Sequence, residues 1–225
     1  MGDDGGRWVE VPPERLVRWV GNFAGRHGPA TVEPGPEAVV LRAQDGTVAE
    51  CHPPFPPLPA GADPGQADPA RLAELMAAHA AAARTVGVLL VRLGGYAAGV
   101  FVGDPPELVA SKTGSRLVHG RAAAGGWSQH RFARRRENQA TAALKAAADA
   151  ALAVLGPYTG RLDAVVLGGD RRAMAGLRAD PRLAPLLAGA QDRFLTVPDP
   201  RLAVLKDTPR AFRAIRIRLT GPAQP

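Results

Sequence analysis

Residues 85–93, TVGVLLVRL, decide the fold, because they form a nearly continuous apolar run near the middle of the chain. A short apolar run bounded by turn residues is typical of a central strand that is buried on both faces of a sheet. Gly94 and Gly95 supply the turn, and residues 96–102 predict the returning strand. Residues 108–121 predict a third strand. The middle of the chain therefore predicts a three-strand meander.

Helices and strands alternate after the meander. Residues 129–155 predict a long helix with an alanine-rich apolar stripe. The remaining predicted elements are a strand at 162–167, a helix at 171–178, a helical turn at 183–187, a strand at 193–197, a helix or turn at 200–208 and an amphipathic edge strand at 211–219. This order predicts an α/β fold in which a mixed sheet has flanking helices.

The first third of the chain has weaker patterns. Residues 12–26 predict a helix, and residues 38–42 and 47–51 predict the two strands of a hairpin. Asp68 is placed to cap a further helix. No sharp domain boundary is visible. The predicted division is an N-terminal helical extension at residues 1–30 followed by one domain at residues 31–225.

Positive charge is concentrated in one stretch of the chain. The whole sequence of 225 residues has a formal net charge of +7, yet residues 111–136 contain no aspartate or glutamate. The basic residues of this stretch are Lys112, Arg116, Arg121, Arg131, Arg134, Arg135 and Arg136. Localised positive charge predicts a polyanionic partner. We expect these side chains to bind RNA phosphates and Trp127 to stack on a base.

Within this basic stretch, residues 120–129 (GRAAAGGWSQ) predict a loop of small residues that ends in a glutamine. Small side chains let a backbone enter a narrow space, and glycine adds conformational freedom. The amide of Gln129 does not titrate near neutral pH, but it accepts and donates hydrogen bonds. It is therefore expected to position a water or to stabilise a developing oxyanion. The predicted catalytic set is Gln129 with Gly125, Gly126 and Ser128.

Other residues of chemically active types are predicted to be structural. Cys51 is the only cysteine, which excludes an intramolecular disulfide, and we expect its thiol to be buried and inert. The turn at residues 168–170 lacks the spacing of a dinucleotide-binding loop. Asp163, Asp170 and Asp180 are expected at turns or helix starts. The histidines lack metal-ligand spacing, so neither a metal nor a cofactor is predicted.

The sequence also bears on location. It contains no apolar run of about 18 residues, and its acidic N-terminus lacks an apolar signal core. These two features predict a cytoplasmic protein with no membrane contact.

The order of parts resembles the catalytic middle domain of archaeal and eukaryotic class 1 peptide-release factors, which carries a Gly-Gly-Gln tip on a ribonuclease-H-like fold. In this chain Trp127 and Ser128 stand between the glycine pair and Gln129. Gly-Gly-Trp-Ser-Gln followed by an arginine-rich helix is more similar to the Vms-like (VLRF-type) release factors of ribosome quality control. The resemblance covers residues 36–220.

This resemblance implies hydrolysis of the ester bond of peptidyl-tRNA on stalled large ribosomal subunits, independent of a stop codon. It maps the essential glutamine of the family onto Gln129 and its glycines onto Gly125 and Gly126. Its arginine-rich segment maps onto Arg131 and residues 134–136. The implied partners are ribosomal RNA of the large subunit and peptidyl-tRNA, with no DNA, and the free protein is expected to be a monomer.

Two alternatives remain open. The insertion of Trp127 and Ser128 is compatible with a non-catalytic rescue module that binds ribosomal RNA or tRNA through residues 131–136. A metal-dependent nuclease on the same fold would need clustered carboxylates, and residues 111–136 contain none.

Overall fold

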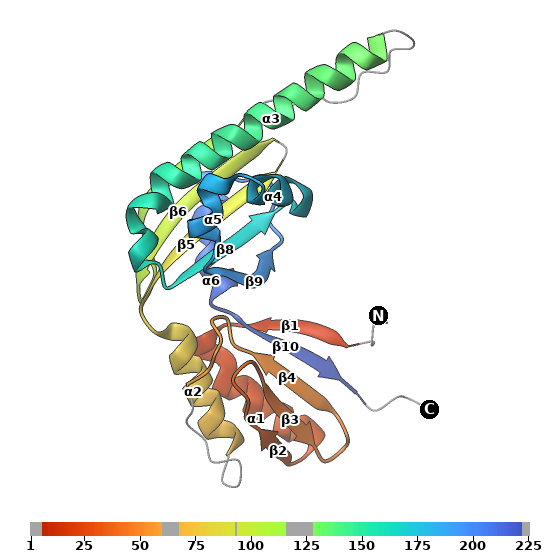
Figure 1. Cartoon of the computed structure of the whole chain (residues 1–225). Helices are drawn as coiled ribbons and strands as arrows, with labels where there is room; N and C mark the ends of the chain where they lie inside the picture. Colours follow the sequence, from red (N-terminus) through yellow and green to blue (C-terminus); the bar gives the residue numbers. More distant parts are fainter. Residues whose placement is uncertain (1–5, 60–67, 93, 116–127, 222–225) are drawn as a thin grey trace. The chain divides into compact units, whose positions relative to one another are not determined.

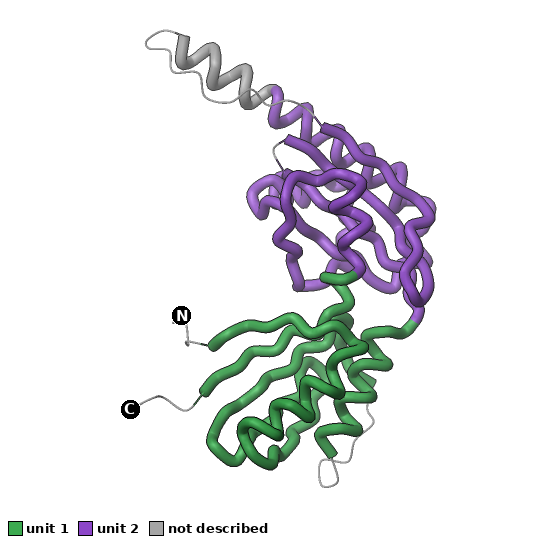
Figure 2. The backbone as a smooth tube through the Cα atoms, turned by 180° about the vertical axis from the view of Figure 1, so that it is seen from behind, with its two compact units in different colours: residues 1–82, 210–225 green, residues 83–209 purple. Residues whose placement is uncertain are grey.

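The structure is a computed structural model that describes residues 6–59, 68–92, 94–115 and 128–221, with the side chains of residues 128–138 excluded. The chain divides into two compact units (Figure 2). Unit 1 comprises residues 1–82 and 210–225, and unit 2 comprises residues 83–209. Each unit contains a five-stranded sheet.

Unit 1 is an antiparallel sheet with helices on one face. Its strands are β1 (Arg7–Val11), β2 (Ala30–Glu33), β3 (Val39–Ala43), β4 (Val48–His52) and β10 (Ile215–Thr220), in the spatial order β1-β10-β4-β3-β2. Its helices are η1 (Pro13–Arg15), α1 (Leu16–His27) and α2 (Pro69–Ala81). Alternate strand residues, among them Leu41, Ile215 and Ile217, pack against Leu16 and Met76 of these helices. Asp68 caps α2, as predicted, by accepting a hydrogen bond from the Arg71 backbone N–H at 3.1 Å.

Unit 1 differs in two ways from the sequence-based expectation. Residues 7–27, expected within a helical extension, contribute β1 as well as α1 to the sheet and core of this unit. The prediction of an edge strand near residues 211–219 is wrong, because β10 lies between β1 and β4. The alternating pattern of β10 arises because one face of the sheet is covered by helices, which leaves the other face polar.

Unit 2 contains the predicted meander. Its strands are β5 (Arg84–Arg92), β6 (Gly95–Gly103), β7 (Glu107–Ser115), β8 (Ala164–Gly169) and β9 (Ala190–Leu195), in the order β7-β6-β5-β8-β9 (Figure 1). The pairs β7–β6 and β6–β5 are antiparallel, whereas β5–β8 and β8–β9 are parallel. This mixed sheet confirms the predicted fold class and has the strand order of the ribonuclease-H-like fold.

Helices cover both faces of the unit 2 sheet. They are α3 (Ser128–Leu155), η2 (Gly156–Arg161), α4 (Arg171–Arg178), η3 (Pro181–Leu183), α5 (Ala184–Leu187) and α6 (Leu202–Phe212). Figure 1 shows α3 crossing the sheet over β5 and β6. Small side chains such as Ala147 and Ala151 bring α3 close to Leu89 and Ala98 of the sheet. On the other face, Leu205 of α6 fills the space that a Cβ on Gly99 would occupy, with its Cδ2 at 2.9 Å.

Residues 139–161, most of them in α3, are long and apolar enough by length and composition alone to cross a membrane. Ala147, Ala151 and Leu155 are nevertheless fully buried against the sheet of unit 2. Lys145 and Asp149 occupy the exposed side. These contacts are those of an amphipathic core helix.

The turn between β8 and α4 holds the chain in a conformation that requires glycine. Gly169 has a φ of 105°, and a Cβ at this position would overlap the backbone carbonyl of Val91 on β5. The next backbone N–H, that of Asp170, donates to the Val91 carbonyl at 2.8 Å. The Asp170 side chain then caps α4 by accepting from the Ala173 backbone N–H at 2.7 Å. This turn therefore joins β5, β8 and α4 at one point.

The buried state of Cys51 leads to a chemical expectation. Its side chain lies in the core of unit 1, and burial raises the pKa of the thiol to about 12. Because the thiolate is the reactive species, Cys51 of the native protein at pH 8 is expected to react with an aromatic disulfide reagent at least about 100-fold more slowly than in the denatured chain. Absorbance of the released thiol, followed with and without urea, measures this ratio. Equal rates would show that the thiol is accessible in the folded protein.

Candidate functional site

The predicted catalytic loop begins and ends in unit 2. β7 ends at Ser115, and α3 begins at Ser128. In the strand register Ser115 lies opposite Gly95, Gly95 lies opposite Arg92, and Val91 lies beside Gly169. The chain therefore leaves β7 at the same edge of the sheet at which β5 and β8 end. This is the edge at which open α/β sheets generally bind their ligands.

The predicted site residues fall into three groups. Arg116, Arg121, Gly125, Gly126 and Trp127 lie outside the described residues. The backbones of Ser128, Gln129, Arg131, Arg134, Arg135 and Arg136 belong to α3, but their side chains lie outside the described part of the chain. Lys112 is described, and its side chain is exposed on β7 opposite Ala98. The structure thus brings Gln129 and the four arginines onto one helix, without showing their contacts.

The position of Gln129 in the first turn of α3 has an electrostatic consequence. The first N–H groups of a helix have no partner within the helix, and they form the positive end of its dipole. The first turn of α3 contains no acidic residue, and arginines follow it at 131 and 134–136. Positive side chains near this end are unfavourable unless an external anion binds them. The backbone therefore favours an anionic partner at the start of α3.

The length of α3 places its two ends in different environments. A helix of 28 residues is about 42 Å long, whereas strands of nine residues such as β5 are about 30 Å long. Among the α3 side chains that the structure describes, the fully buried ones lie between Ala147 and Leu155, in the C-terminal half of the helix. The sheet is therefore too short to cover the whole helix, and the described core contacts anchor only the end opposite Gln129.

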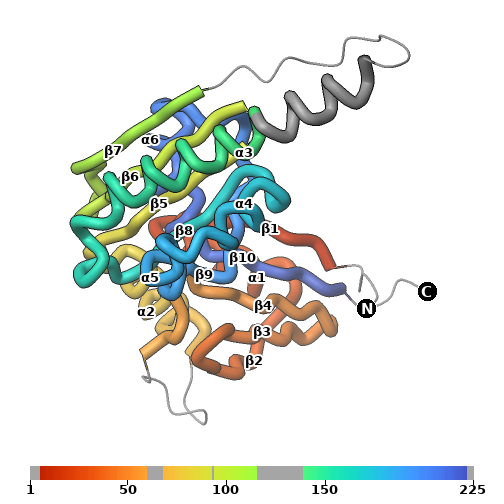
Figure 3. The backbone as a smooth tube through the Cα atoms, turned by 45° about the horizontal axis from the view of Figure 1, so that its top comes forward, coloured from red at the N-terminus to blue at the C-terminus, as the bar shows by residue number. Residues whose placement is uncertain are grey.

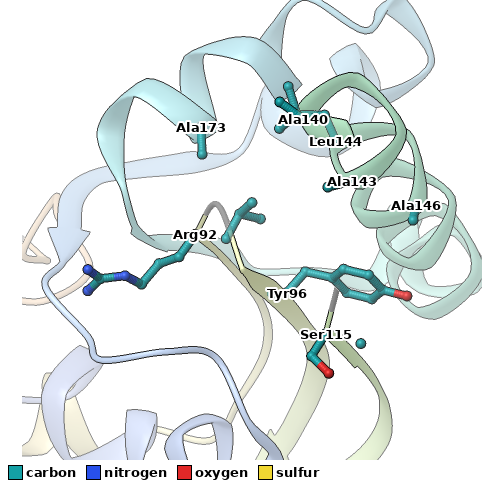
Figure 4. A pocket seen from close by; sticks show the side chains of 11 residues that line it. Arg92, Tyr96, Ser115, Ala140, Ala143, Leu144, Ala146 and Ala173 are labelled. Atoms are coloured by element: carbon teal, nitrogen blue, oxygen red, sulfur yellow. The ribbon is translucent and has the colours of Figure 1, made fainter. Parts of the chain in front are cut away.

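A small cavity lies beside the base of the loop (Figure 4). It has a volume of about 170 Å³, and its lining includes three alanines of α3 together with Tyr96 and Ser115. The Tyr96 ring lies over Gly114 on the neighbouring strand, where a Cβ would overlap it. Arg92 also borders the cavity, but its Nη1 donates to the Val197 carbonyl at 2.8 Å. The described lining thus provides no carboxylate or imidazole for acid–base catalysis.

The aspartates considered for metal binding have structural roles. Asp163 accepts a hydrogen bond from the Thr85 backbone N–H at 2.7 Å, and Asp170 caps α4. Asp180 forms an ion pair with Arg182 at 2.7 Å, and hydrogen bonds from Arg182 hold the pKa of this carboxyl below its ordinary value. Within the described ranges, no group of three or more His, Cys, Asp or Glu side chains could hold a metal. The described residues therefore contain no metal-binding centre of the kind that a metal-dependent nuclease would require.

Sequence reasoning did not identify Tyr96 or Arg92 as residues near the site. Tyr96 follows the Gly94-Gly95 turn, and Arg92 interrupts the apolar run of β5 at its last residue. A charged residue that ends a buried strand could have indicated the edge of the sheet at which the predicted loop begins. The position of Tyr96 beneath α3 depends on packing between distant segments, which no local pattern reveals.

Comparisons with known proteins place these observations in a family. Solved structures similar to this chain include an archaeal protein (14% identity, TM-score 0.38), the archaeal translation termination factor aRF1 (13%, 0.40) and the Vms1 mitochondrial localization core (9%, 0.33). The alignments cover 89%, 89% and 90% of this chain, and 62%, 62% and 80% of the other chains. The chain thus spans less than two thirds of the two archaeal proteins. No curated protein sequence matches it.

A family model gives the more specific result. The model, described as Actinobacteria/chloroflexi VLRF1 release factor, matches residues 84–218, which is more than half of the chain. The match covers nearly all of unit 2 and continues into β10. It confirms the resemblance to VLRF-type release factors that the Gly-Gly-Trp-Ser-Gln segment indicates. The chain therefore belongs to the Actinobacteria/chloroflexi VLRF1 release-factor family.

Proposed function

We propose that this protein releases nascent chains by hydrolysing the ester bond of peptidyl-tRNA on stalled large ribosomal subunits, without reading a stop codon. The observation that carries the proposal is the position of Gln129 in the first turn of α3, three residues after Gly126 and inside an acid-free basic stretch. Membership in a release-factor family supports it. The proposal includes a cytoplasmic location and a monomeric free protein.

The reaction assigned to Gln129 is positioning of water. A water oxygen bonds to the ester carbonyl carbon, the bond to the tRNA ribose oxygen breaks, and that oxygen takes a proton from the water. The products are a free peptide carboxyl group and a tRNA hydroxyl. The uncharged Gln129 amide can orient the water and stabilise the oxyanion, but it cannot remove a proton. The N-terminal N–H groups of α3 add positive potential beside the developing negative charge.

The rest of the proposed active site consists of RNA. The cavity beside Ser115 is lined by alanines and lacks a described carboxylate or imidazole, so unit 2 offers no complete hydrolytic centre among its described residues. A loop of small residues that enters a site formed by ribosomal RNA does not need a complete hydrolytic centre of its own. Arg131 and residues 134–136 would hold phosphates around that site through charge-assisted hydrogen bonds.

The test is release from defined complexes. Large subunits carrying peptidyl-tRNA are mixed with the purified protein, and free peptide is separated from peptidyl-tRNA by gel electrophoresis. Peptide is expected to appear in proportion to the added protein and to be absent without it. Binding that weakens steeply with salt but yields no free peptide would contradict the proposal and would favour a non-catalytic RNA-binding rescue module.

A further inference from the structure

A second groove in unit 2 lies between α4 and β9, apart from the cavity beside Ser115. Its volume is about 180 Å³, and polar groups contribute much of its lining. Arg171 and Arg178 border it from α4, and Gln191, Asp192 and Phe194 border it from β9. β9 is the outermost strand of the unit 2 sheet and lies next to β8 (Figure 3). The groove therefore lies at the margin of that sheet.

The two arginines of this groove are available to a ligand. Both are exposed, and no ion pair to an acid is present for either among the described residues. Nearby Arg182 differs, because its guanidinium pairs with Asp149 at 2.8 Å and with Asp180 at 2.7 Å. The fold therefore uses Arg182 to hold η3 against α3, whereas Arg171 and Arg178 have no such role.

The spacing and orientation of the arginines suit an extended polyanion. Residues seven apart lie on the same face of a helix, so Arg171 and Arg178 are separated by about 10 Å along α4. The guanidinium carbon of Arg171 lies 4.6 Å from the centroid of the Phe194 ring. This stacking holds the side chain in place and lowers the entropy that a bound phosphate would cost. The groove thus presents two guanidinium groups along α4, that of Arg171 held by stacking and that of Arg178 exposed.

The groove begins at the edge of the sheet at which the predicted catalytic loop starts. Arg171, the first residue of α4, follows Gly169 by two residues, and Gly169 lies beside Val91 near the end of β5. The predicted catalytic loop begins at the end of β7. Three strand spacings separate β7 from β8, a distance of about 14 Å across the sheet. One RNA surface could therefore reach both the start of the loop and Arg171.

We propose that Arg171 and Arg178 bind two phosphates of an RNA strand, as a contact separate from the arginine-rich start of α3. Arginine binds phosphate through paired N–H groups, and α4 and β9 together carry four arginines and one aspartate. That aspartate, Asp192, lies in the groove and opposes the anion. The identification of the RNA as ribosomal rests on the proposed function, whereas the phosphate contact does not.

The test measures RNA binding by the full chain. A fluorescent oligouridylate is titrated with wild type and with Arg171→Gln/Arg178→Gln over a range of KCl concentrations. Loss of two phosphate contacts is expected to reduce the slope of log K against log[KCl] by about 1.4 and the affinity at 0.1 M KCl by about tenfold. Asp192→Asn removes the opposing charge and is expected to strengthen binding at least about twofold, a gain that misfolding cannot produce.

The matched control is Arg161→Gln. The Arg161 guanidinium also stacks on a ring of unit 2, 4.8 Å from the centroid of Tyr158, but it lies outside the groove. The Arg161→Gln variant should leave the slope of log K against log[KCl] unchanged. An unchanged slope in the double variant, or no RNA binding by wild type, would overturn the proposal. If the double variant lost poly-glutamate binding to the same extent as RNA binding, the groove would be reassigned to an acidic peptide. Because no peptide release is measured, failure of the proposed function leaves this outcome interpretable.

Discussion

Replacement of Gln129 by alanine is expected to slow peptide release from large subunits by at least about 100-fold, because removal of one preorganised hydrogen-bonding group from an oxyanion or water site costs about 100- to 1,000-fold in rate. The methyl group that remains cannot orient a water. Binding to the subunit should change little, since Gln129 is neutral and the arginines of α3 remain. Single-turnover release and cosedimentation measure the two quantities separately.

A glutamine elsewhere on the same helix provides the control. Gln139 lies ten residues further along α3, beyond the arginine-rich segment. Gln139→Ala should release peptide at the wild-type rate. If Gln129→Ala does so too, Gln129 has no part in the reaction. If Gln129→Ala instead fails to bind the subunit, its role lies in docking and the chemistry assigned to it is wrong.

Replacement of Gly169 by alanine is expected to lower the free energy of unfolding of unit 2 by about 3 kcal/mol, because two separate costs combine. The backbone at Gly169 has a φ of 105°, which a residue with a Cβ adopts only under strain. A Cβ would also overlap the Val91 carbonyl, so β5 and β8 would have to separate where the Asp170 N–H bonds to that carbonyl. Urea denaturation followed by far-ultraviolet circular dichroism measures the loss.

Gly189→Ala is the matched comparison for this effect. Gly189 lies just before β9, no atom lies within 4 Å of the position that its Cβ would take, and its φ is not positive. Its substitution is expected to change stability by less than about 0.5 kcal/mol. A result for Gly169→Ala as small as this would show that the turn after β8 relaxes without disturbing β5.

Local sequence patterns predicted two kinds of element: strands that are buried on both faces, and helices whose own caps and apolar spacing mark them. β5 was predictable because its core-facing positions on both faces are apolar, which leaves an uninterrupted run. α4 begins and ends as predicted, since Asp170 caps it and its apolar residues have helical spacing. β1 and β2 were not predicted, because neither carries a hairpin signal like the Asp45-Gly46 turn that joins the equally short strands β3 and β4. The partner of β1 lies about 200 residues away in the chain, so no local signal marks the pair.

The candidate site divides in the same way. The start of a helix next to Gln129 follows from sequence, because the loop of small residues gives way to a long alanine-rich pattern. The contact of Arg171 with Phe194 joins a helix to a strand that follows three elements later. Only the folded arrangement of α4 and β9 reveals that groove. Sequence therefore located the residues of the loop but not the second basic surface.

The return of β10 to unit 1 determines the order in which the units can be completed during translation. All of unit 2 is synthesised before residues 215–220, which insert between β1 and β4. Unit 2 can therefore acquire its full set of strands while β1 still lacks a neighbour. A chain that stops at residue 213 would keep every strand of unit 2 and deprive unit 1 of an interior strand.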